Sequence, residues 1–104
     1  MHANRLLLDA QLAERGPLRF TPAGVPAIDI LLRHASRQPE AGAERTVECE
    51  LAGVAFGDAA EAMARVPLGA MLRCKGFLAR RWRTGITVAM HVNEFEQINA
   101  TEGN

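Results

Sequence analysis

The sequence predicts an all-β fold, a five-stranded barrel with one short helix. Apolar side chains recur at every second residue in five separate segments, as in strands that bury one face. Clusters of glycine, proline and polar residues separate these segments, which is typical of turns. With 104 residues, 48% of them apolar, the chain is long enough to form a single domain, 1–104, around one core.

Three of the expected strands lie in the first half of the chain, over about residues 4–14, 25–36 and 45–55. Gly16 and Pro17 end the first strand, and the sequence of residues 21–24 predicts a turn before the second. Between the second and third strands, residues 37–44 are polar and are expected to form the connection.

A helix is expected over Asp58–Arg65, where Asp58 is placed to cap the first turn or to contribute charge to it. Two more strands follow, at about 70–80 and 86–98. Leu78 and Ile86 are expected to face inward in these strands, and Gly76 within the fourth predicts a bulge or a sharp bend. Residues 99–104 form a polar tail that is expected to fray.

Three strands, a helix and two strands is the element order of the OB-fold, a five-stranded Greek-key barrel. Another small barrel or half of a β-sandwich fits the same order. Strands of about ten residues with bends favour the closed barrel.

Few residues suggest catalysis or metal binding. Cys49 and Cys74 lie at apolar positions of alternating segments, which predicts two core thiols, and the histidines are too scattered for a zinc site. No nucleophile or pocket motif accompanies the carboxylates, so no catalytic residue, metal or cofactor is expected. The absence of a signal peptide and of a long apolar run predicts a cytoplasmic protein without a membrane segment.

One segment points to function. The formal net charge is zero, yet the expected loop between the fourth and fifth strands carries three arginines beside the only tryptophan: Arg80, Arg81, Trp82 and Arg83. Guanidinium groups bind phosphates, and an indole ring offers a face on which a base stacks. A solvated hairpin tip with Trp82 packed on its own barrel or at a dimer edge is the competing interpretation.

The chain resembles bacterial single-stranded DNA-binding proteins, in particular their PriB-like members. The resemblance runs through Asn4-Arg5-Leu6, the Thr21-Pro22-Ala23-Gly24-Val25-Pro26 turn, Val66-Pro67-Leu68-Gly69, Lys75-Gly76-Phe77 and Met90-His91-Val92. It covers essentially the whole chain. It implies a non-catalytic OB-fold homodimer that binds single-stranded DNA and supports replication restart with the primosomal helicase PriA and other primosome proteins.

In that family, the loops between strands two and three and between strands four and five bind DNA. The resemblance transfers the second loop to the Arg80–Arg83 segment and the edge of the first to Arg33, His34, Arg37 and Arg45. The first loop departs from the family pattern, because Ala43, Glu44 and Glu48 stand where relatives can place aromatic and basic groups.

Further candidates come from the strand pattern. Arg73 and Lys75 are expected on the outward side of the fourth strand, where they face DNA, solvent or a partner subunit. Phe77 shares that side and suits either a base or a dimer contact. Arg19 is a candidate phosphate contact, and Phe20 is expected to pack locally.

Two other functions stay open. An adaptor that docks the helicase and binds DNA weakly fits the zero net charge and the acidic third strand with Glu48 and Glu50. An RNA-binding OB module also fits, because arginine and stacking do not distinguish DNA from RNA without a group that recognises the 2′-hydroxyl.

Overall fold

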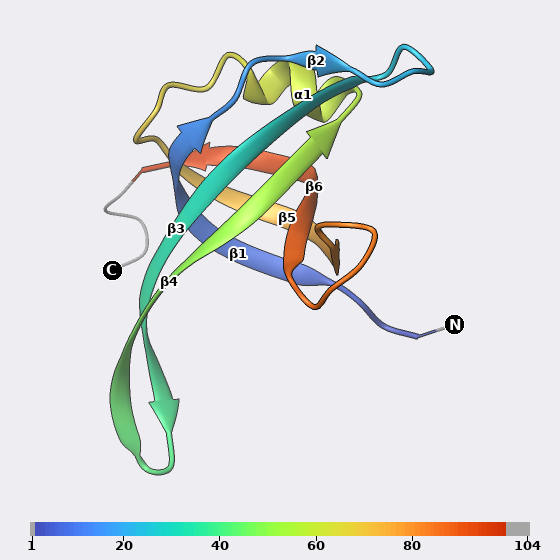
Figure 1. Ribbon diagram of the computed structural model, residues 1–104. Coiled ribbons are helices and arrows are strands. Elements are labelled where there is room, and N and C mark those ends of the chain that lie inside the picture. The colour runs from blue at the N-terminus through green and yellow to red at the C-terminus, as the bar shows by residue number, and fades with distance from the viewer. Residues whose placement is uncertain (1, 100–104) are drawn as a thin grey trace.

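The structure, a computed structural model, describes residues 2–99. Its strands and its helix follow in the order β1 (Leu6–Arg15), β2 (Arg19–Phe20), β3 (Pro26–Glu40), β4 (Ala43–Phe56), α1 (Asp58–Met63), β5 (Met71–Arg80) and β6 (Val88–Ile98). The strand order is β1-β5-β6-β4-β3-β2, and an additional pairing of β1 with β3 closes the five long strands into a barrel. The predicted OB-fold is confirmed, with α1 lying over one end of the barrel (Figure 1).

The core is built from the inward residue of each alternating pair. Leu12, Ile28, Leu32, Leu72 and Met90 are fully buried, and together they bring four of the five long strands into one apolar cluster. Helix α1 adds a buried methionine to this cluster from the end of the barrel. Burial of such side chains is worth about 1.5–3 kcal/mol each, which is why the alternating pattern determines the barrel.

The bulge expected near Gly76 is present. Lys75 pairs with Glu94 while Gly76 pairs with Val92, so Asn93 of β6 is the extra residue. A Cβ atom at Gly76 would lie 1.7 Å from the carbonyl oxygen of His91, so the backbones of β5 and β6 approach too closely for any other residue. The bulge bends β6 sharply where it rounds the barrel (Figure 1).

The prediction that residues 37–44 form a connection between two strands is wrong. Strands β3 and β4 stay paired up to Glu40 and Ala43, and only Ala41 and Gly42 form the turn. Both turn residues have positive φ angles, 54° and 82°, as in the tight hairpin turns whose twist matches that of the strands. The result is a long two-stranded arm, residues 33–50, that extends beyond the barrel (Figure 1).

The arm also explains why the prediction for Cys49 is wrong. Cys74 is buried in the core as expected, but Cys49 lies on the arm and is exposed. Its position in the alternation is that of an inward residue, yet the barrel does not reach that far along β4. Period-two alternation therefore identifies a strand face without showing what covers it.

Other differences lie at the ends of elements. Strand β2 was not predicted, and the helix ends at Met63, with Gly57 rather than Asp58 as its N-cap. Ile86 lies in the loop before β6 and is 95% exposed, and Leu78 near the end of β5 is also exposed. At these ends the barrel wall has no facing strand to bury an apolar side chain. The expected fraying of 99–104 falls, apart from Asn99, outside the described residues.

Candidate nucleic-acid interface

The loop between β5 and β6, residues 81–87, has every side chain exposed. Its base is closed by a hydrogen bond of 2.8 Å from the amide of Arg81 to the carbonyl oxygen of Thr87. The Arg81 guanidinium carbon lies 4.7 Å from the centre of the Trp82 ring, and Trp82 is 60% exposed. Trp82 therefore does not fill the core, and Arg81 stacks against it with a cation–π contact.

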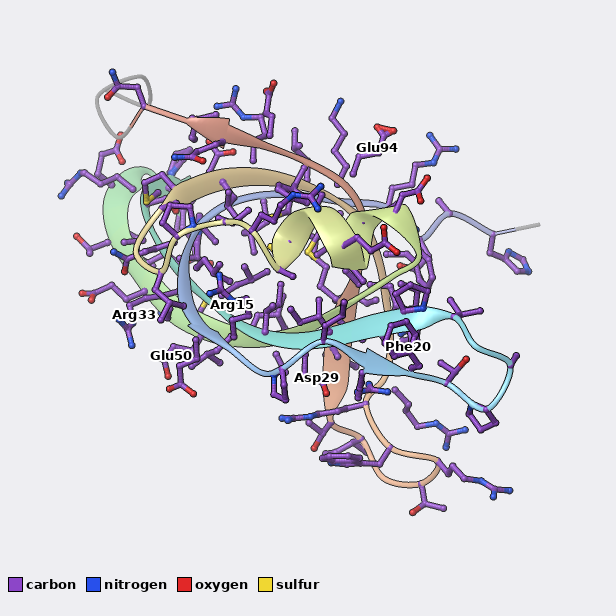
Figure 2. The ribbon with its side chains drawn as sticks, turned by 90° about the horizontal axis from the view of Figure 1, so that it is seen from above. Arg15, Phe20, Asp29, Arg33, Glu50 and Glu94 are labelled. Carbon is purple, nitrogen blue, oxygen red and sulfur yellow. The ribbon has the colours of Figure 1, made fainter. Side chains whose placement is uncertain are left out.

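Four ion pairs engage most of the other predicted cations. Arginine binds carboxylate at 2.7–3.1 Å in each of them: Arg19–Asp29, Arg33–Glu50, Arg45–Glu40 and Arg73–Asp9. Figure 2 shows Arg33 and Glu50 pointing away from the barrel together. These arginines meet a phosphate only after an intramolecular pair is broken.

Arg37 and His34 are also engaged. The Arg37 guanidinium donates to the hydroxyl of Thr46 over 3.3 Å. His34 Nδ1 lies 2.6 Å from the carbonyl oxygen of Asp9, and its Nε2 lies 2.8 Å from the hydroxyl of Ser36. His34 is therefore a satisfied group at the edge of the barrel.

The remaining predicted cations have no such partner. Within residues 2–99, no carboxylate oxygen lies within 4.0 Å of the side-chain nitrogens of Arg80, Arg81, Arg83 or Lys75. Three of these four lie at the β5–β6 loop. Lys75 lies further back on β5, opposite Glu94. Of the eleven predicted DNA-binding residues, four arginines are held in ion pairs, whereas Arg80, Arg81, Arg83 and Lys75 have no carboxylate partner among residues 2–99.

Hydrogen bonds from Arg73 hold the pKa of Asp9 below its ordinary value of 3.8, although partial burial opposes them. Because this pKa is lower in the folded state, the pair stabilises the fold above about pH 4, and that contribution is lost as the pH falls further. The pair is partly exposed, so solvent screening keeps the effect small. We expect Asp9→Asn to lose less stability than the wild type between about pH 5 and pH 3. Urea unfolding at each pH measures this, and parallel curves for the two proteins would contradict it.

An aromatic stack that the sequence did not reveal lies on the outward face of the barrel. The ring centre of His91 on β6 lies 4.8 Å from that of Phe77 on β5 and 5.7 Å from that of Phe56 on β4. The planes are inclined by 18° and 29°, so the three rings are stacked. They come from strands that lie side by side, since Phe77 pairs with His91 and His91 pairs with Val54.

This aromatic stack, defined as Phe56, His91 and Phe77, continues toward the arginine loop. Phe77 lies three residues before Arg80 on β5, and Phe56 is 41% exposed at the end of β4. The alternation in the sequence placed Phe77 outward correctly, but it does not show that residues 56, 77 and 91, from three strands, are neighbours. Phe20 was expected to pack locally, yet it is 63% exposed at the end of β2 (Figure 2).

Neither a cluster of metal-binding side chains nor a membrane-spanning helix is found among residues 2–99. No group of three histidine, cysteine, aspartate or glutamate side chains among residues 2–99 is placed to hold a metal ion. Over the same residues, no helix has the length and apolar character needed to cross a membrane.

Comparison with known proteins identifies the family. Residues 4–94 match a family described as "another single-strand binding protein family". The replication restart protein PriB of Bordetella pertussis is 40% identical over 100 residues, covering 96% of this chain and 94% of that protein. The chain belongs to the PriB family of single-strand binding proteins. PriB of Neisseria meningitidis serogroup B is 33% identical over 98 residues, covering 93% of this chain and 97% of that relative.

Solved structures agree with this assignment. The structure of PriB from Ralstonia solanacearum covers 94% of this chain and 100% of its own, with a TM-score of 0.87 and 36% identity. The single-stranded DNA binding protein from Thermus aquaticus has a TM-score of 0.74 and 23% identity, covering 97% of this chain and 52% of its own. The PriB match supports the family, whereas the more distant one shows the fold alone.

Proposed function

We propose that this chain is a non-catalytic, cytoplasmic single-stranded DNA-binding protein of replication restart. One observation carries the proposal: three arginines without carboxylate partners, Arg80, Arg81 and Arg83, lie together at one loop, beside an exposed tryptophan and next to the aromatic stack. Free cations and exposed rings are the two components of single-strand binding. The names of the PriB relatives support the same role.

In the proposed complex, phosphates contact Arg80 and Arg83 while bases stack on exposed rings. Arg81 already covers part of Trp82, so the opposite ring face is the one that receives a base. The strand then continues over the aromatic stack on β4, β5 and β6. Single-stranded DNA suits this surface because unpaired bases present their faces, whereas those of a duplex are already stacked.

The engaged cations have a secondary place in this proposal. Arg19, Arg33, Arg45 and Arg73 have carboxylate partners, so a phosphate contact must first replace an existing ion pair. Homodimer formation and cooperation with the PriA helicase are part of the proposal through the family resemblance.

Trp82→Ala tests the stacking part of the proposal. We expect it to weaken binding of a dT oligonucleotide by about 1–3 kcal/mol, because stacking on an aromatic side chain contributes that much per base. Fluorescence anisotropy of a labelled oligonucleotide measures the change. Leu68→Ala is the control, since Leu68 is 59% exposed in the turn before β5, outside the proposed path. Equal affinities of both variants would exclude Trp82 from the site.

An adaptor function is the second candidate, favoured by the zero net charge and by Glu48 and Glu50 on β4. In that case the chain would still bind the helicase after Arg80, Arg81 and Arg83 are replaced with alanine. Retention of the triple variant by immobilised PriA would support a separate protein-binding surface, whereas its loss would tie helicase binding to the loop.

A further inference from the structure

The outer edge of β4 is open over most of its length. Between Ala43 and Ala52, β4 pairs with β3 on one side, and on the other side no strand among residues 2–99 reaches it until Gly53 pairs with Met90. Ten residues of strand span about 33 Å at roughly 3.3 Å per residue. Such an edge presents unpaired amide and carbonyl groups that another strand can bind.

Of the usual protections of an exposed edge, only charged side chains are present here. Residues 43–52 contain no proline, lysine or glycine, and the β3–β4 register is regular from Ala27 to Glu40 without a bulge. Instead, even-numbered positions carry Glu44, Glu48 and Glu50 on one face. Odd-numbered positions carry Val47, Cys49 and Leu51 on the other.

The charge of this edge is not neutralised within the chain. Glu50 is paired with Arg33, but Glu44 and Glu48 form no ion pair with the described residues. A shallow hollow of about 500 Å³ lies along the outer half of the arm, between Glu40, Arg45 and Glu48. Open edge, acidic face and apolar face therefore occur on the same ten residues.

We propose that the β4 edge binds an extended segment of another protein in which basic residues alternate with apolar ones. The segment adds a strand through backbone hydrogen bonds. Its alternate side chains meet the glutamates on one face and Val47, Cys49 and Leu51 on the other. Such a segment complements the β4 edge in its backbone hydrogen bonds, in its charge and in its apolar side chains.

Charge disfavours the two other occupants of such an edge. Two copies of β4 paired antiparallel about residues 46–48 would place glutamates opposite one another on the same face, which is destabilising. A nucleic acid strand would bring its phosphates against Glu44 and Glu48. The edge is also separate from the arginine loop, since Figures 1 and 2 both place the arm and that loop on different parts of the molecule.

Cys49 provides a reporter for occupancy of this edge. It is exposed near the base of the arm, whereas burial raises the pKa of the Cys74 thiol to about 11, so maleimide reacts selectively with Cys49. The probe is a ten-residue peptide of alternating lysine and valine. Its controls are a peptide of alternating glutamate and valine and a peptide with five lysines followed by five valines. We expect the first to slow alkylation of Cys49 at least about tenfold and the controls to leave it unchanged.

A charge exchange makes the test specific. In Glu44→Lys/Glu48→Lys, the glutamate–valine peptide should protect Cys49 and the lysine–valine peptide should not. Both replaced side chains are exposed, so an unchanged circular dichroism spectrum is expected. Equal protection by all peptides, or no protection, would overturn the proposal. Protection by a dT oligonucleotide would also overturn it by placing the arm in the DNA path. DNA binding itself is measured separately by anisotropy, so either proposal can fail without the other.

Discussion

Replacing Arg80, Arg81 and Arg83 together with alanine is expected to remove most of the salt dependence of single-stranded DNA binding. Each neutralised phosphate contributes about −0.7 to the slope of log affinity against log salt, so four cations including Lys75 give about −2.8. With Lys75 alone the slope falls to about −0.7. Between roughly 0.05 and 0.2 M salt, the wild type then loses about fifty-fold in affinity and the variant about threefold. Anisotropy titrations of a dT oligonucleotide across that range measure both slopes.

The matched control removes three arginines that already have partners. Arg19, Arg33 and Arg45 are each bound to a carboxylate, so replacing them with alanine removes the same formal charge from a different set of sites. Their variant should keep a slope close to that of the wild type. If this variant lost the slope and the loop variant kept it, DNA would follow the arm and its neighbouring strands. In that case the ion pairs seen in the free protein would be broken on binding.

The fold was predictable because a strand in a barrel wall buries every second side chain, so that alternating apolar residues in the sequence identify the strand. All five long strands, the helix and the bulge at Gly76 follow from local patterns. Local patterns do not show how far along a strand the rest of the barrel covers its apolar face. Cys49 alternates like a core residue, yet it lies on an uncovered arm, and Ile86 continues an apolar pattern into an exposed loop.

The candidate site was predictable only in part, for a related reason. The arginine loop is contiguous in sequence, so its residues are found together. The partners of Arg19, Arg33 and Arg73 come from other strands, 10, 17 and 64 residues away. The stack of Phe56, Phe77 and His91 likewise joins three strands. Register between strands decides both features, and register cannot be read from a single segment.

The largest effect on stability is expected from Gly76→Ala. A Cβ atom there would lie 1.7 Å from the carbonyl oxygen of His91 and 2.8 Å from its carbonyl carbon, and both are backbone atoms that no side-chain rotation can move. Strands β5 and β6 would have to separate at the bulge, so the free energy of unfolding should fall by more than about 4 kcal/mol. Urea unfolding followed by circular dichroism measures the loss.

Gly16→Ala is the matched control, because a Cβ atom at Gly16 would meet its nearest neighbour, the carbonyl oxygen of Asp29, at an ordinary 3.6 Å. We expect the control to change the free energy of unfolding by less than about 1 kcal/mol. If Gly76→Ala were equally mild, β6 would not lie so close to β5. A larger spacing of the two strands would also contradict the ring contact between His91 and Phe77, since the close approach of the two backbones brings these rings together. The stability of this one glycine variant therefore tests the geometry on which the proposed base-stacking surface depends.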